Sequence, residues 1–124
     1  MKRITLNKTS LKVSPICLGT ADFGDKVSQE LAFKILDHFY DRGGNFIDTA
    51  AVYGRWLPSG ENISEQMIGQ WLRLKKTSSP VIVATKGGHY KLNAPEISRI
   101  TKKDITADIE NSLRTLGLET IDLY

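Results

Sequence analysis

Residues Val81-Ile82-Val83-Ala84-Thr85 form an uninterrupted, largely β-branched run in a chain of 124 residues. A strand with one solvated face alternates polar and apolar residues, whereas a parallel strand covered on both faces reads as a continuous apolar run. This run is of the second kind. Because parallel strands are joined by crossover connections, usually helices, we expect strands and helices to alternate along the rest of the chain.

Three amphipathic helices are predicted on either side of this strand. Their start and stop signals are Ser28 and Gly43-Gly44 for the first, Asn62–Glu65 and Thr77–Pro80 for the second, and Thr101–Asp104 and Gly117 for the third. Apolar residues recur at helical spacing in each: Ala32, Ile35, Leu36 and Phe39, then Met67, Ile68, Trp71 and Leu72, then Ile105, Ile109, Leu113 and Leu116. The two four-residue start signals have the spacing of capping boxes.

Further short strands complete the alternation. Arg3–Leu6 and Leu11–Val13 alternate polar and apolar residues around a turn-forming segment, which predicts a β-hairpin. Short apolar runs end at Gly19 and at Asp48, and Ile121–Tyr124 starts another strand. The predicted order is a hairpin, then strand and helix three times, then a strand.

Two architectures fit this order, an open doubly wound sheet and a closed barrel. An open sheet would place a GxGxxG phosphate loop after its first strand, and Gly19–Gly24 lacks that spacing. A barrel gathers reactive residues at the C-terminal ends of several strands, where Asp48 and Lys86 stand. We therefore predict an α/β fold, the N-terminal half of a parallel (β/α)8 TIM barrel preceded by a short β-hairpin. Residues 1–124 would be a single partial domain with the first four strands and three helices of the barrel.

The composition is that of an ordinary soluble globular chain, with 40% hydrophobic and 25% charged residues and a net charge of +3. The basic pairs Lys75-Lys76 and Lys102-Lys103 are shorter than a nucleic-acid-binding stripe. No segment has the roughly 20 apolar residues of a membrane span, and residues 1–10 lack the apolar core of a signal peptide. The single Cys17 excludes an internal disulfide, which fits a reducing cytoplasm, and its apolar neighbours predict that it is buried. We expect a cytoplasmic protein without nucleic-acid or membrane partners and without a bound metal.

Asp48, Tyr53 and Lys86 would meet at one rim of the barrel. A phenol has an unperturbed pKa of about 10, and an ammonium within hydrogen-bond reach lowers such a pKa by stabilising the phenolate. A carboxylate beside the lysine would keep it charged. The three side chains thus form a candidate general acid that could protonate a carbonyl oxygen receiving a hydride from a cofactor. Singly, each has another explanation: Asp48 as a turn cap, Tyr53 as a half-buried aromatic, Lys86 as a solvated strand end.

The segment Gly44–Gly54, GNFIDTAAVYG, closely resembles the signature of the aldo-keto reductase family. Other matches follow in the family's order: Ser64-Glu65 with Ile68-Gly69, then Ala84–Gly88 (ATKGG), then Ile109–Leu118 (IENSLRTLGL) with Ile121–Tyr124 (IDLY). Together they cover most of the chain, so the resemblance is specific.

The resemblance implies NADPH-dependent reduction of aldehydes or ketones. Tyr53 would be the proton donor, assisted by Lys86, and Asp48 would hold Lys86 in place. The residues that would approach the nicotinamide end of the cofactor are Gly19, Thr20, Ala21 and Asp48. In the family, a histidine that orients the carbonyl falls a few residues beyond the IDLY segment, outside residues 1–124.

Other rim residues have open interpretations. Phe23 and Trp56 lie in rim loops and would contribute an apolar substrate wall, or would pack locally. His89 would contact substrate, or would be an ordinary loop histidine, which we favour. His38 lies within the first helix and is no substitute for the carbonyl-orienting histidine.

A complete barrel of this type has eight strands and about 250 residues. We therefore expect residues 1–124 alone neither to bind NADPH tightly nor to turn over substrate, and we expect their open strand edges to invite self-association. Three interpretations of the chain stay open: a piece of a longer reductase, which we favour; a fragment completed by a second copy or another chain; and a non-catalytic relative that binds a nucleotide or a partner. Substrate identity and the choice of NADPH over NADH would depend on later rim loops.

Overall fold

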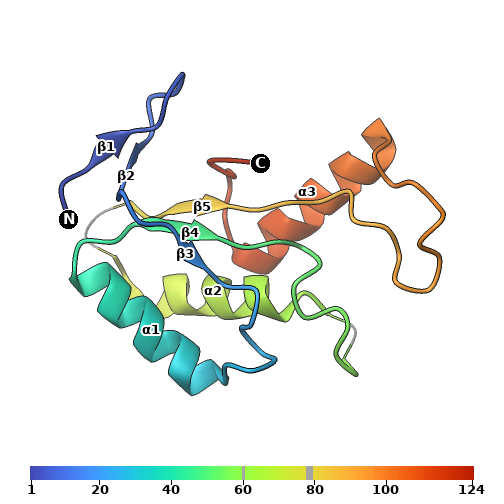
Figure 1. The fold of residues 1–124 in the computed structure, drawn as a ribbon, viewed down its shortest axis with the longest axis horizontal. Helices are drawn as coiled ribbons and strands as arrows, with labels where there is room; N and C mark the ends of the chain where they lie inside the picture. Colours follow the sequence, from blue (N-terminus) through green and yellow to red (C-terminus); the bar gives the residue numbers. More distant parts are fainter. Residues whose placement is uncertain (60, 78–79) are drawn as a thin grey trace.

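The computed structural model describes residues 1–59, 61–77 and 80–124. It begins with the predicted hairpin, in which β1 (Ile4–Thr5) and β2 (Lys12–Val13) pair antiparallel, with Ile4 opposite Val13. The turn between them closes through a hydrogen bond from the Leu6 amide to the Leu11 carbonyl oxygen, with an N···O distance of 2.9 Å. The hairpin projects from one end of the molecule (Figure 1).

A parallel sheet follows, in the order β3 (Leu18–Gly19), β4 (Phe46–Asp48) and β5 (Ile82–Ala84). Its register places Gly19 beside Asp48 and Asp48 beside Ala84, so the three strands end in one row. All three residues of β5 are buried, as the unbroken apolar run predicts. The sheet thus brings three strand ends to a common rim.

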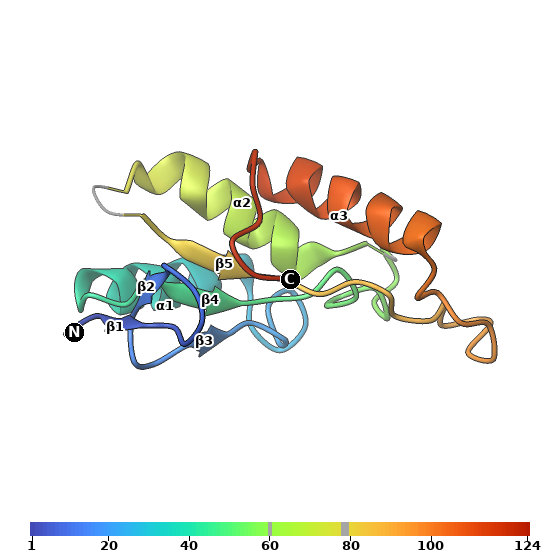
Figure 2. The ribbon, with the colours of Figure 1, turned by 90° about the horizontal axis from the view of Figure 1, so that it is seen from above.

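Helices α1 (Gln29–Asp41), α2 (Ile63–Lys75) and α3 (Lys102–Leu116) lie on one side of this sheet, with α3 beside α2 (Figures 1 and 2). The other side of the sheet is covered by no helix of the described chain. The helices and sheet enclose a core that includes Leu36, Ile47, Ile68, Val83 and Leu116, each at most 1% exposed. Each such side chain contributes about 1.5–3 kcal/mol through burial. The α/β half-barrel prediction is confirmed.

Most predicted helix ends are confirmed. Ser28 accepts a hydrogen bond from the Leu31 amide at the start of α1, and Thr101 accepts one from the Asp104 amide at the start of α3. Gly43 and Gly117 follow the two helices with φ angles of 85° and 69°, the left-handed conformation that suits glycine. Within residues 1–59, 61–77 and 80–124, no helix combines the length and apolar character needed to cross a membrane.

The start of α2 differs from the predicted capping box. Asn62 stands at the N-cap, but its side chain makes no hydrogen bond to the backbone of the first turn. Instead its amide donates to Glu65 Oε2, with an N···O distance of 2.6 Å. The reason is that the Glu65 side chain is fully buried and needs donors. Of the predicted break after this helix, Ser78 and Ser79 lie outside the described residues.

The buried stripe of α3 also differs from the prediction. The residues it buries are Asp108, Ser112 and Leu116, whereas Ile105, Ile109 and Leu113 are only half-buried. Apolar spacing missed this face because two of its three buried side chains are polar. Asp108 is buried with hydrogen-bond partners, as described below.

Two other expectations change. Ile121–Tyr124 forms no strand ladder; it contributes one parallel bridge, between Leu123 and Ala84 of β5. Cys17, expected to be buried, is exposed. It lies just before the edge strand β3, and a short apolar run is buried only where other elements cover both of its faces.

Candidate active site

The trio of predicted reactive residues is assembled by the register of the sheet. Asp48 ends β4 beside Ala84 of β5, and Lys86 comes two residues after Ala84. The pairing continues beyond the strands, because the Thr49 amide donates to the Ala84 carbonyl and the Ala51 amide to the Lys86 carbonyl, at 2.9 and 3.0 Å. The chain after β4 is therefore held against Lys86, and this brings Tyr53 within its reach.

The Lys86 ammonium has three oxygen partners. Its Nζ donates to Asp48 Oδ2 at 2.8 Å, to the Thr49 carbonyl oxygen at 2.7 Å and to the Tyr53 hydroxyl at 3.3 Å. It also lies 5.0 Å from the centroid of the Tyr53 ring. An ammonium has three protons to donate, so these contacts fix its direction.

Burial acts to lower the pKa of Lys86, but the hydrogen bonds to Asp48 and Tyr53 and the electrostatic attraction of the same two groups together outweigh it, and the pKa is raised. Lys86 is therefore an ammonium at neutral pH. The side chains of Lys86 and Asp48 are 50% and 36% exposed, and exposed ion pairs stabilise folding by only about 0–1 kcal/mol. The value of this pair lies in orientation and charge.

A layer of polar side chains lies buried beneath the trio. Ser64, at the start of α2, donates to the Thr20 carbonyl at 2.9 Å and lies 3.0 Å from Thr49 Oγ1. The Thr85 hydroxyl donates to Glu65 Oε1 at 2.6 Å. All five side chains are at most 2% exposed. This buried polar layer ties the ends of β3, β4 and β5 to the first turn of α2.

The threonines of this layer follow a pattern that the sequence analysis missed. Thr20, Thr49 and Thr85 each come directly after the last residue of a parallel strand. A threonine in the same place after each of three strands is a signal visible in the sequence. It marks the hydroxyls that anchor the rim.

Two pockets meet at Tyr53. The first, here the aromatic pocket, has a volume of about 570 Å³ and is lined in part by Tyr53, Trp56, His89, Tyr90 and Leu92. The second, here the β3 pocket, has a volume of about 400 Å³ and is lined in part by Gly19, Thr20, Ala21, Asp48 and Tyr53. Tyr53 therefore borders both pockets.

The β3 pocket contains the residues predicted to approach a cofactor. Gly19 and Ala21 are exposed, and a Cβ atom at Gly19 would meet nothing within 4 Å. Thr20 is 1% exposed, and its hydroxyl donates to the Asp48 carbonyl at 2.9 Å. Thr20 thus shapes the pocket from beneath, while Gly19 and Ala21 leave an open surface on which a flat ring could rest.

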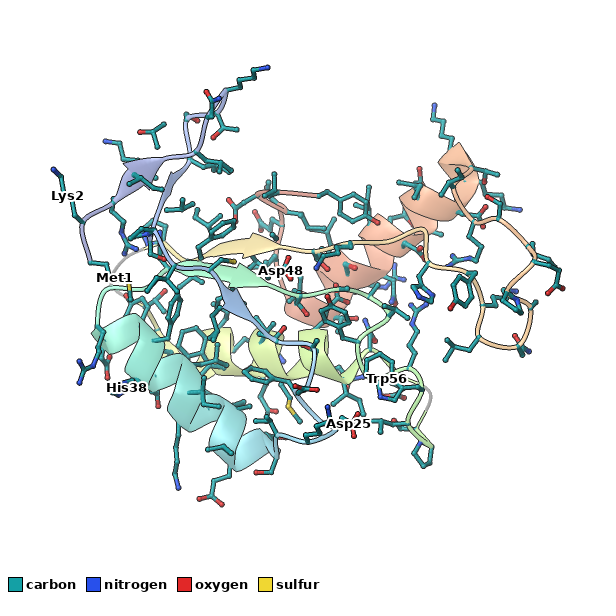
Figure 3. All side chains as sticks on the ribbon, in the orientation of Figure 1. Met1, Lys2, Asp25, His38, Asp48 and Trp56 are labelled. Atoms are coloured by element: carbon teal, nitrogen blue, oxygen red, sulfur yellow. The ribbon has the colours of Figure 1, made fainter. Side chains whose placement is uncertain are left out.

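The remaining predicted residues are placed differently from one another. Phe23 is 3% exposed and packs in the core, although it also lines the β3 pocket. Trp56 is 46% exposed, and its indole donates to Asp25 at 3.0 Å across two rim loops (Figure 3). His89 lines the aromatic pocket beside Tyr90, 4.1 Å from ring to ring. His38 lies on α1, away from Asp48 (Figure 3).

Comparison with known proteins agrees with this geometry. The profile of the Aldo/keto reductase family matches residues 15–124. Norsolorinic acid reductase B of Aspergillus parasiticus is 38% identical over 128 residues, covering 92% of this chain and 32% of the relative. Aryl-alcohol dehydrogenase [NADP(+)] of Phanerodontia chrysosporium is 37% identical over 131 residues, with the same shares covered.

Solved structures show the same likeness. The holo form of the aldo-keto reductase AKR11C1 from Bacillus halodurans superposes with a TM-score of 0.78 at 28% sequence identity, covering 100% of this chain and 39% of that one. The chain spans about a third of the length of the curated relatives it matches. The family profile covers most of the chain, and the chain belongs to the aldo/keto reductase family.

Proposed function

We propose that the protein is an NADPH-dependent oxidoreductase that reduces aldehydes or ketones to alcohols. The observation that carries this proposal is the Lys86 ammonium, held 3.3 Å from the Tyr53 hydroxyl and 2.8 Å from Asp48 on the wall of an open pocket. The names of two relatives, a reductase and an NADP(+) aryl-alcohol dehydrogenase, support the reaction class and the cofactor.

In this proposal, Tyr53 gives its hydroxyl proton to the carbonyl oxygen as negative charge develops there. The Lys86 ammonium stabilises the phenolate that remains, and Asp48 keeps Lys86 charged and directed. A reduced nicotinamide bound nearby would supply the hydride. The three side chains thus perform the proton delivery of the reaction.

The residues of the β3 pocket fit the nicotinamide end of such a cofactor. Gly19 and Ala21 offer an open surface without a large side chain, and Asp48 offers a carboxylate at its edge. Tyr53 borders this pocket and the aromatic pocket alike. A carbonyl compound in the aromatic pocket would lie against Tyr53, which also borders the pocket proposed for the nicotinamide, and Trp56 is proposed as its apolar contact. Phe23 packs in the core and borders the β3 pocket, so it is not proposed as a contact of that compound.

We also propose that residues 1–124 form a single partial domain that is inactive when isolated. The described residues supply three parallel strands and the bridge between Ala84 and Leu123 at the edge of β5, whereas a closed barrel has eight strands. An isolated polypeptide of residues 1–124 is expected to show neither tight NADPH binding nor turnover. Turnover by that polypeptide would contradict this part of the proposal.

The test uses the protein expressed from its complete coding sequence. NADPH oxidation is followed with a panel of aldehydes and ketones, and the melting temperature is measured with and without NADPH. Carbonyl-dependent oxidation is the expected result. Stabilisation by NADPH without oxidation would favour a non-catalytic nucleotide-binding relative. The absence of both stabilisation and oxidation would contradict the reductase and the nucleotide-binding interpretations alike.

A further inference from the structure

The loop from Lys86 to Ile100 forms one wall of the aromatic pocket. It contributes His89, Tyr90 and Leu92, of which the last two are 46% and 49% exposed. Its residues form no helix or strand, apart from one isolated bridge between Lys91 and Ala94. Loops of this length hold a fixed shape only where specific contacts bind them.

Asp108 supplies such contacts from α3. It is 5% exposed, and its two carboxylate oxygens bind different parts of the loop. Oδ2 accepts from the Gly88 amide at 2.9 Å, and Oδ1 accepts from Arg99 Nη2 at 2.8 Å. Arg99 also donates through Nη1 to the His89 carbonyl oxygen at 3.0 Å. We name these four residues the loop clamp, because they join the start of the loop, its end and α3.

The charges of the loop clamp depend on one another. The Arg99 side chain is 14% exposed and that of Asp108 is 7% exposed. Burial acts to raise the pKa of Asp108, but the hydrogen bonds from Arg99 and the Gly88 amide, together with the positive charges of Arg99 and Arg55, outweigh it and lower the pKa. Removing Asp108 would leave the nearly buried Arg99 with the more distant carboxylate of Asp104, at 3.8 Å, and removing Arg99 would leave the buried Asp108 carboxylate without its ion-pair partner, which is unfavourable. The pair therefore forms as a unit.

The backbone of the loop is shaped to reach this pair. Gly88 has a φ of 72°, a conformation that favours glycine. A Cβ atom at Gly87 would lie 2.8 Å from the Cβ of Asp108, which is too close for a real side chain. Glycine at both positions lets the backbone pass directly against α3 before it continues to His89.

We propose that Arg99 and Asp108 are positioning residues for the carbonyl substrate, because they hold the His89–Leu92 wall of the aromatic pocket that Trp56 also lines. This inference rests on the proposed function. The Lys86 ammonium has its own supports in Asp48 and the Thr49 carbonyl. The loop clamp therefore acts on substrate binding and leaves the proton delivery unchanged.

The test compares Asp108→Asn and Arg99→Lys with the control Glu110→Gln. The control removes one negative charge from an exposed position of the same helix. In the protein from the complete coding sequence, with benzaldehyde as the probe, KM is expected to rise about tenfold in both variants, since a small displacement of a substrate wall has effects of this order or larger. We expect kcat and the NADPH Kd to change by less than about twofold and the pH profile of kcat to keep its shape. The control is expected to match the wild type.

A second measurement follows hydrogen exchange of the Gly88 amide, which donates to Asp108. Slow exchange is expected in the wild type and faster exchange in Asp108→Asn, because the Gly88 amide loses a charged acceptor. Arg99→Lys keeps the charge but not the planar fork, so it serves where Asp108→Asn fails to fold.

Several results would overturn the inference. Unchanged KM in a folded variant would do so, even with a lower melting temperature, because that describes a purely structural pair. A shifted pH profile of kcat with unchanged KM would place the pair in proton delivery instead. Fast hydrogen exchange of the Gly88 amide in the wild type would show that Asp108 does not hold the loop. Wild-type protein without carbonyl turnover would defeat the proposed function itself, whereas turnover with unchanged KM would defeat only this inference.

Discussion

Replacing Thr85 by valine would remove one hydrogen bond from the buried polar layer while nearly keeping the shape of the side chain. Thr85 is 2% exposed, and its hydroxyl donates to the fully buried Glu65 at 2.6 Å. Hydrogen bonds to charged groups contribute about 1.5–3 kcal/mol. Because Glu65 would keep its bond from Asn62, we expect a loss at the lower end, about 1.5–2 kcal/mol.

The assay is urea denaturation of the purified variant and wild type, compared through the free energy of unfolding. Thr106→Val is the matched control, since Thr106 is exposed on α3, and surface substitutions change stability by within about 0.5 kcal/mol. Equal stability of the Thr85 variant and this control would refute the role given to the buried polar layer. A loss in the expected range would support the layer as the anchor of the rim beneath Lys86.

Other predictions concern the rim and α3. Lys86→Met is expected to lower carbonyl turnover about 10²–10⁴-fold, the range for general acid catalysis, in an NADPH oxidation assay with the wild type as reference. Burial acts to lower the pKa of Lys86, but Asp48 and Tyr53 raise it more. Lys86 therefore keeps its charge at every pH below this raised pKa, and kcat should not fall through lysine deprotonation below the pH range in which a lysine ordinarily titrates. Such a fall in kcat would contradict this expectation. Gly87→Ala is expected to cost about 1–3 kcal/mol of stability through overpacking, because the new Cβ would lie 2.8 Å from the Cβ of Asp108; an unchanged urea midpoint would count against this packing. Ser112→Ala is expected to stabilise by about 0.5–1 kcal/mol, because within the described residues Ser112 Oγ is buried without a hydrogen-bond partner, and thermal unfolding would reveal a destabilisation if that hydroxyl is needed.

Much of the fold follows from short-range patterns in the sequence. The unbroken run at Val81–Thr85 correctly indicates a buried parallel strand, and Ser28 and Thr101 correctly mark helix starts. These signals depend on neighbouring residues along the chain, so they can be read without knowing the tertiary structure. The half-barrel and the row of strand ends follow from them.

Features that depend on distant partners were not predicted. The burial of Asp108 requires Arg99 and the Gly88 amide, and the orientation of Asn62 depends on the buried Glu65. The burial of Cys17 was wrongly predicted because the sequence does not show which strand lies at the edge of a sheet. For the site, positions at strand ends indicated that the trio shares a rim, whereas the Lys86 contacts depend on the sheet register.

The central claim is that Tyr53 delivers the proton, and Tyr53→Phe tests it most directly in the protein from the complete coding sequence. We expect carbonyl reduction to fall about 10²–10⁴-fold, with the NADPH Kd within about twofold of the wild type, since the phenyl ring still fills the same place. Tyr40→Phe on α1 makes the same chemical change away from the rim and is expected to keep turnover. Retained carbonyl reduction by Tyr53→Phe would contradict the account.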